Sequence, residues 1–242
     1  TAGVKVLGTG TTSISNCIFR NNNATAGYSS AVSLNVAGGS ISNCLIYGNT
    51  GLPAIYMLGG TVYNSTVVNN TAGGANLAQT TTSPTCNIYN SVFWGTDASS
   101  GTVSVANAST AGDFKYNATS SSTPIGTGLT ISGNIILPQN NTTGINAPNF
   151  SNPTSNDWSL TSASSLIDIG NGSISGVPTA DYVNVSRPMG GAYDIGAYEY
   201  TLAQEKTSNG GFEAAVGTYT VAESTTNVLM RVATTWDATT AT

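Results

Sequence analysis

The 242-residue chain has no histidine and few charged side chains, with six Lys+Arg and eleven Asp+Glu. Enzymes and metal sites that depend on histidine are therefore excluded. A net charge of −5 with six cations cannot supply the cationic surface that binds phosphates, so we expect no nucleic-acid partner. The sequence also lacks a run of about 18 to 20 apolar residues, and we expect no transmembrane segment.

Small uncharged residues take the place of the missing charges, since Thr, Ser, Asn and Gly make up 119 of the 242 positions. Hydrophobic residues still account for 39 %, unlike disordered chains, which combine low hydrophobicity with high net charge. The three cysteines, Cys17, Cys44 and Cys86, cannot form a closed disulfide set and lack the close pairs of a zinc site. We expect them to be small buried residues.

A nine-residue pattern recurs four times in the first hundred residues. Its first and sixth positions are apolar, its third is Asn, its fourth is Cys or Ser, and its ninth is Asn or Thr. The other four positions vary. The central asparagines are 27, 21 and 26 residues apart, a spacing typical of repeat architectures. The four copies are residues 14–22, 41–49, 62–70 and 88–96.

Each repeat predicts two or three short strands separated by tight turns. Stacking such units about 4.8 Å apart would satisfy the backbone hydrogen bonds and create a continuous core. Asparagine suits a sharp bend because it tolerates the left-handed conformation, and its amide can bond the same amide one coil above. We therefore predict an all-β parallel β-helix, a solenoid. The residues expected to form a structural asparagine ladder are Asn16, Asn43, Asn64 and Asn90.

The residues after 133 differ from the repeats and carry a recognisable series of motifs. The most specific are residues 165–170 (Ser-Leu-Ile-Asp-Ile-Gly) and residues 194–200 (Asp-Ile-Gly-Ala-Tyr-Glu-Tyr). The series resembles the carboxy-terminal closure of secreted right-handed parallel β-helix proteins with pectate-lyase-like repeats, common in Bacteroidetes. Leu166 replaces the usual proline and Asn184 the usual glycine of that closure. The resemblance implies a right-handed helix and a secreted or cell-surface location.

Three parts follow from the repeats and the resemblance. Residues 1–137 are expected to form the coils, residues 138–200 a C-terminal closure that caps the β-helix, and residues 201–242 a short β-rich tail. The tail is either the truncated start of a further domain or a strand-exchange element. The apolar residues expected to cover the last coil are Trp158, Leu160, Leu166, Ile167 and Ile169.

The closure also gathers one cation and four carboxylates. We expect a structural network in which Arg187 bridges the carboxylates, because a guanidinium can bind several oxygens at once. A calcium site built from Asp168, Asp181 and Asp194 and a catalytic pair are the two less favoured alternatives, and no other cofactor is expected. The members of the structural network are Asp168, Asp181, Arg187, Asp194 and Glu199.

No charged residue occurs from position 21 to position 96, so most of the repeats offer no acid, base or metal ligand beyond tyrosine, cysteine and amides. We therefore name no catalytic residue, and the enzyme assignment stays open but is disfavoured. Outside the closure, the one cluster of charges is formed by Asp97, Asp113 and Lys115, which we expect to be solvated on irregular coils.

Binding is better supported than catalysis. Alternation along a strand would turn the fourth residue after each central asparagine outward, and two tyrosines precede the bends. Aromatic rings beside amides and hydroxyls suit neutral sugar rings, although such rings can also pack under loops or against a neighbouring subunit. The candidate glycan-stacking residues are Tyr47, Tyr63, Tyr89 and Trp94.

The sequence as a whole favours a non-catalytic, secreted or cell-surface module with a structural or adhesive role and neutral glycans as candidate ligands. One alternative is a polysaccharide lyase or glycoside hydrolase. Another is a subunit of an extracellular filament assembled through residues 201–242. The expected partners are accordingly polysaccharide or neighbouring copies of the chain.

Overall fold

The computed structural model describes residues 3–7, 10–72, 77–79, 85–95, 103–105, 112–120, 129–138 and 147–201. These residues form twenty-one short strands and one 3-10 turn, Pro153–Ser155, and residues Thr1–Tyr200 group into one compact unit. No helix in this described part is long and apolar enough to cross a membrane. Asp97 and residues 202–242, on which two of the expectations rest, lie outside it.

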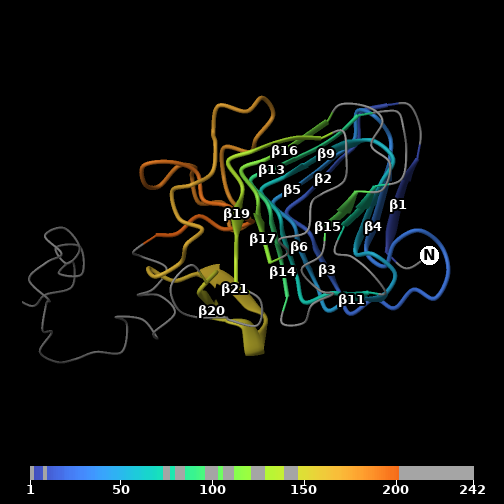
Figure 1. The fold of residues 1–242 in the computed structure, drawn as a ribbon, viewed down its shortest axis with the longest axis horizontal. Helices are drawn as coiled ribbons and strands as arrows, with labels where there is room; N and C mark the ends of the chain where they lie inside the picture. The colour runs from blue at the N-terminus through green and yellow to red at the C-terminus, as the bar shows by residue number, and fades with distance from the viewer. Residues whose placement is uncertain are drawn as a thin grey trace, which may run out of the picture. The chain divides into compact units, whose positions relative to one another are not determined.

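Most strands belong to three parallel sheets (Figure 1). Sheet A contains β1 (Val4–Leu7), β4 (Val32–Asn35), β8 (Ile55–Met57), β12 (Leu77–Gln79) and β15 (Val103–Val105). Sheet B contains β2 (Ser13–Ser15), β5 (Ser40–Ser42), β9 (Gly60–Tyr63), β13 (Cys86–Tyr89), β16 (Gly112–Lys115) and β18 (Leu129–Ser132). Sheet C contains β3 (Ile18–Arg20), β6 (Leu45–Tyr47), β10 (Thr66–Val68), β14 (Val92–Trp94), β17 (Ala118–Thr119) and β19 (Ile135–Ile136).

The chain passes from sheet A to sheet B to sheet C and then begins the next pass in the same order. Each strand pairs in parallel with the equivalent strand of the next pass, so that Ile14 lies opposite Ile41 and Ile41 opposite Val62. A short parallel pair, β7 (Thr50–Gly51) and β11 (Thr71–Ala72), and an antiparallel pair, β20 (Phe150–Asn152) and β21 (Asp157–Leu160), complete the strands. The prediction of an all-β chain with parallel sheets is confirmed.

The bend between sheet B and sheet C is made by one residue in the left-handed conformation. The central asparagines have φ values of 52° at Asn16, 50° at Asn43, 40° at Asn64 and 49° at Asn90. Their tolerance of this conformation explains why asparagine recurs there. Only one amide ladder bond forms along this row, however, from Nδ2 of Asn90 to Oδ1 of Asn64 at 3.4 Å.

A continuous asparagine ladder lies instead at the ninth position of the repeat. Nδ2 of Asn22 donates to Oδ1 of Asn49 at 2.7 Å, and Nδ2 of Asn49 donates to Oδ1 of Asn70 at 2.8 Å. The backbone N–H groups of Asn22 and Asn49 donate to the same oxygens, each at 3.0 Å. Asn49 and Asn70 are fully buried, so this ladder satisfies polar groups that water cannot reach.

The interior between the three sheets is apolar. Rows of equivalent residues from successive passes stack on one another, for example Ile41, Val62 and Ile88 in sheet B. Cys44 and Cys86 belong to this core, and burial raises the pKa of both thiols to about 12. Cys17, in the first pass, is only half-buried, and all three cysteines are free.

Residues 147–201, which we call the C-terminal segment, are yellow to orange in Figure 1 and lie beside sheets B and C. Trp158, Leu160 and Leu166 pack against the outer side of sheet C, where they meet Tyr47 and Trp94, and the partly buried Ile167 and Ile169 join the same cluster. The prediction that these side chains cover the last coil is wrong in position. They cover the outer side of sheet C instead, because the outward residues of this sheet in the cluster are mostly apolar.

Candidate functional site

The outward side of sheet B is polar from the first pass to the last. Because side chains alternate along a strand, Ile14, Ile41 and Val62 face the core while their neighbours face outward. The outward residues form two columns, half-buried or exposed, which we call the polar face. They are Ser13, Ser40, Thr61, Asn87, Asp113 and Thr130 in one column, and Ser15, Ser42, Tyr63, Tyr89, Lys115 and Ser132 in the other.

Two of the four aromatic candidates lie on the polar face. The rings of Tyr63 and Tyr89 stack with their centroids 5.8 Å apart and their planes at 23°. The Tyr63 hydroxyl donates to the carbonyl of Ser175 at 3.1 Å, and the Tyr89 hydroxyl donates to Oδ2 of Asp113 at 2.6 Å. Both rings are thus held in fixed orientations at the surface.

Asp113 and Lys115 also belong to the polar face. They lie on strand β16, and the Lys115 ammonium is 2.8 Å from Oδ1 of Asp113. Partial desolvation raises the pKa of Asp113, but the hydrogen bonds from Lys115 and Tyr89 outweigh it and lower the pKa below its usual value. The expectation of solvated charges on irregular coils is wrong for this pair, because both residues are in a regular strand and are bonded to neighbours.

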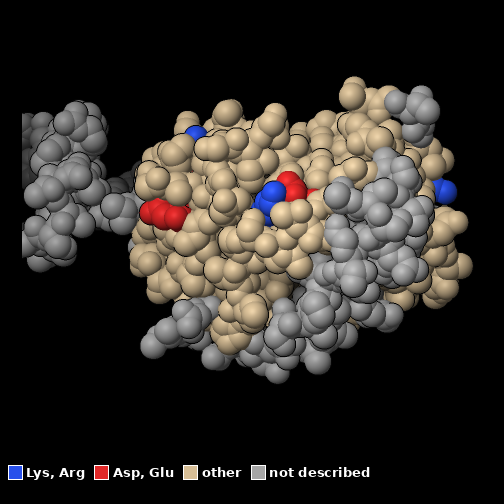
Figure 2. Space-filling model, turned by 45° about the horizontal axis from the view of Figure 1, so that its top comes forward, with Lys and Arg blue, Asp and Glu red and all other residues tan. Residues whose placement is uncertain are grey.

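A groove with a volume of about 380 Å³ separates the polar face from the C-terminal segment. Ser13, Ser15, Ser40 and Ser42 contribute hydroxyls that have no hydrogen-bond partner among the described residues. The remaining lining residues are Asn16, Asn43, Tyr63, Gly176, Pro178, Thr179, Ala180, Asp181 and Asn184. The groove therefore presents hydroxyls and amides beside one tyrosine ring. Figure 2 shows the same character more widely, with few charged side chains on a largely uncharged surface.

The other two aromatic candidates are buried. Tyr47 is 5 % exposed and packs against Trp158, with ring centroids 5.8 Å apart. Trp94 is fully buried, and its Nε1 donates to the carbonyl of Pro138 at 3.1 Å. The expectation that these rings are available to stack on a sugar is wrong. As the alternation of side chains along a strand predicted, both rings point away from the core. The C-terminal segment, however, covers the outer side of sheet C.

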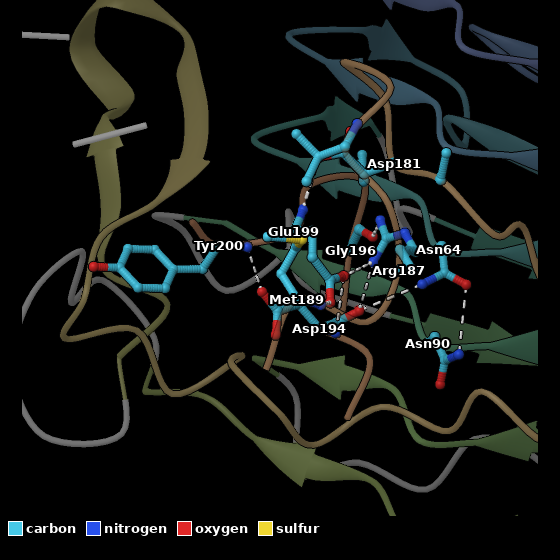
Figure 3. A network of polar contacts seen from close by, with 12 residues as sticks. Asn64, Asn90, Asp181, Arg187, Met189, Asp194, Gly196, Glu199 and Tyr200 are labelled. Atoms are coloured by element: carbon cyan, nitrogen blue, oxygen red, sulfur yellow. Dashed lines mark hydrogen bonds and ion pairs between the residues drawn. The ribbon is translucent and has the colours of Figure 1, made fainter. Parts of the chain in front are cut away.

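Arg187 is at the centre of the charged group in the C-terminal segment (Figure 3). Its side chain is fully buried and pairs with Glu199, with Nη1 2.6 Å from Oε2. Its other hydrogen bonds go to backbone carbonyls, of Asp194 at 3.2 Å and of Gly196 at 2.9 Å. The expected bridging of several carboxylates by Arg187 is therefore limited to one carboxylate.

Backbone N–H groups satisfy the remaining carboxylates. Asp181 accepts from the N–H groups of Val183, Val185 and Glu199, at 2.8 to 2.9 Å. Asp194 accepts from Asp168 and Tyr200, and Asp168 accepts from Ala192. The described residues contain no group of three or more His, Cys, Asp or Glu side chains placed to hold a metal ion.

Burial changes the acidity of this group. It raises the pKa of the Glu199 carboxyl to about 7, although the Arg187 guanidinium lowers it, and it also raises the pKa of Asp194. The geometry nevertheless indicates a structural role, since each carboxylate accepts backbone N–H groups and so holds parts of the segment together. Nε of Arg187 has no hydrogen-bond partner among the described residues, but the side chain is fully buried and its other two nitrogens are bonded within the segment.

The bend asparagines attach this segment to the stack. Nδ2 of Asn43 donates to the carbonyl of Ala180 at 2.7 Å, and Nδ2 of Asn64 donates to that of Asp194 at 3.3 Å. Asn16 donates to the carbonyls of Asp181 and Tyr182, and Asn90 both donates to and accepts from Asn171. This role was not predicted from the sequence. An amide on a left-handed bend points out of the coil, which is the signal that could have indicated it.

Comparisons with protein-family models, curated proteins and solved structures found no match to this chain. The resemblance of residues 165–170 and 194–200 to a known type of closure therefore remains a prediction.

Proposed function

We propose that the chain is a non-catalytic module of a secreted or cell-surface right-handed parallel β-helix protein, and that its polar face binds neutral polysaccharide. The β-helix is supported by the repeated order of sheets A, B and C and by the parallel pairing of equivalent strands. The right hand is supported by the strong preference of parallel crossover connections for that hand.

The observation that supports glycan binding best is the stacked pair of Tyr63 and Tyr89 beside a groove of free hydroxyls. A sugar ring has apolar C–H faces and a rim of hydroxyls. An aromatic ring can pack against the face, while serine hydroxyls and asparagine amides bond the rim. Tyr63 lines the groove together with these hydroxyls and amides, so both kinds of contact are available to one bound ring.

The charges of the polar face favour a neutral ligand and binding over hydrolysis. Glycoside hydrolysis generally needs two carboxyls that flank the bond, one of them protonated. Asp113 is held ionised by its low pKa and its ion pair with Lys115, and Asp181 has its oxygens occupied by three backbone N–H groups. The bound Asp113–Lys115 pair contributes no net charge that would attract a uronate.

The test is calorimetric titration of the full chain with soluble neutral glycans and with polygalacturonate. We expect binding to at least one neutral glycan, and we expect Tyr63→Ala to weaken it by about tenfold through loss of the ring contact. Tyr28→Ala is the matched control, because Tyr28 is an exposed ring that stacks on Tyr56, whose strand belongs to sheet A.

Three outcomes would overturn the proposal. These are absence of binding to all neutral glycans, equal losses in Tyr63→Ala and Tyr28→Ala, and preferential binding of polygalacturonate. Release of new reducing ends or unsaturated products during incubation would instead favour the lyase or hydrolase.

A further inference from the structure

The exposed large apolar side chains of the described residues gather at the two ends of the stack. Eight such side chains are exposed, and five of them are in the first or last pass. In the first pass these are Val4, Leu7 and Ile18, with exposed fractions of 41 %, 65 % and 46 %. In the last pass they are Ile131 and Ile136, with 49 % and 62 %.

The same two passes hold the free edges of sheets B and C. Sheet B ends at β2 on one side and β18 on the other, and sheet C ends at β3 and β19. An edge strand presents unpaired N–H and C=O groups that can pair with another chain. Native edges are usually protected by lysine, proline or an inward charge. Among the residues of these four strands, Arg20 is the one charged side chain and no proline occurs.

The two ends also match in register. The row that begins at Ile14 continues through Ile41, Val62, Ile88 and Phe114 and ends at Ile131. The row that begins at Phe19 in β3 likewise ends at Ile136 in β19. If a further pass followed β18 and β19, the residues opposite Ile131 and Ile136 would have to be apolar. The first pass has apolar residues, Ile14 and Phe19, at these two positions.

We propose that the chain associates with copies of itself head to tail, with β18 and β19 of one copy paired in parallel with β2 and β3 of the next. Ile131 would then lie against Ile14, Ile136 against Phe19, and Ser132 beside Ser15. The contact repeats the register found inside each molecule and covers the exposed Ile18, Ile131 and Ile136 of sheets B and C.

A second copy fits these edges better than the C-terminal segment of the same chain. That segment is held along sheet C and the bend by the Trp158 cluster and by Asn43 and Asn64, and in β19 it packs on the outward Ile135 only. Ile131 and Ile136 remain exposed in its presence. Because the two contacting surfaces differ, the association is heterologous and does not close, which predicts linear oligomers.

The experiment uses two single substitutions in the full chain, each at one end. Ile18→Lys places an ammonium at the β3 edge and Ile136→Lys places one at the β19 edge. Burying either ammonium is unfavourable, so each variant should associate at least about tenfold more weakly than the parent chain in analytical ultracentrifugation. A mixture of the two variants should form a 1:1 dimer that does not grow, because each supplies the intact end that the other lacks.

Val183→Lys is the control, since Val183 is 50 % exposed but lies in the C-terminal segment, and it should leave association unchanged. Circular dichroism checks that the variants fold. Ser132→Cys mixed with Ser15→Cys should in addition give a disulfide-linked dimer that neither variant forms alone.

The proposal is overturned if the parent chain stays monomeric at every concentration, or if the mixture of the lysine variants stays monomeric. It is equally overturned if both lysine variants associate like the parent chain, which would assign the contact elsewhere, for example to residues 201–242. None of these results bears on glycan binding, which is measured separately.

Discussion

The hydroxyl of Tyr89 donates a 2.6 Å hydrogen bond to Oδ2 of Asp113, 24 residues further along the chain and one strand away in sheet B. The bond joins the aromatic pair of the polar face to its one ion pair, because the same carboxylate binds Lys115. Burial and this bond together raise the pKa of Tyr89, which therefore stays protonated and remains a donor. The polar face is thus a connected surface in which the rings and the charges position one another.

Substituting Tyr89 with phenylalanine tests that connection. Loss of the hydroxyl removes a bond to the ionised form of Asp113, so the pKa of Asp113 should rise towards its ordinary value. The free energy of unfolding should fall by about 1 kcal/mol or less, because the pair is half-exposed. Carboxyl chemical shifts followed by NMR during a pH titration measure the first effect. Tyr63→Phe, which loses the bond to Ser175 instead, should leave Asp113 unchanged; equal shifts in both variants would disprove the connection.

Glu199 should make the stability of the chain depend on pH. Its pKa is about 7 in the folded chain and near 4.5 when unfolded, so the folded state keeps a proton that the unfolded state has released. The contribution of Glu199 to stability is then greatest below about pH 4.5 and is lost as the pH rises through 7, because in that window the folded state binds more protons. Asp194, whose pKa is also raised, contributes in the same direction.

Thermal unfolding at a series of pH values measures this slope. Glu199→Gln cannot titrate and should give a flatter profile between pH 5 and 7, although its amide NH2 would face groups that are themselves donors and would also lower its overall stability. A slope that is the same in the variant and the parent chain would show that Glu199 is already ionised throughout this range.

The ladder of buried asparagines should matter more for stability than any amide on the surface. The Asn49 side chain accepts from Asn22 and donates to Asn70 and to the carbonyls of Phe19 and Tyr47. Asn49→Ala removes all of these side-chain bonds from a fully buried position and should cost roughly 3 kcal/mol in the free energy of unfolding.

Asn35→Ala is the control for the ladder, because Asn35 is only half-buried and accepts one bond, from the hydroxyl of Ser33. Its cost should be no more than about 1 kcal/mol. Chemical denaturation of both variants gives the comparison, and equal costs would mean that the ladder is not a principal source of stability.

Local sequence patterns predicted the strands and the bends well. The alternation of Ile14, Ile41 and Val62 with serine or tyrosine defines both sides of sheet B, and the recurrence of asparagine marks the left-handed bends. The same alternation correctly turned Tyr47 and Trp94 away from the core, but it led to the wrong environment for both. A period of two specifies which side of a sheet a residue occupies and says nothing about what covers that side.

By itself, then, the sequence determined the repeated strands, the bends and the scarcity of charge, because these depend on neighbours a few residues apart. Only the tertiary structure decided which side of the stack stays open. The C-terminal segment packs on sheet C and leaves sheet B exposed, which unites Tyr63, Tyr89, Asp113 and Lys115 on one surface. That choice depends on contacts between residues more than a hundred positions apart, such as Asn43 with Ala180, which no local pattern encodes.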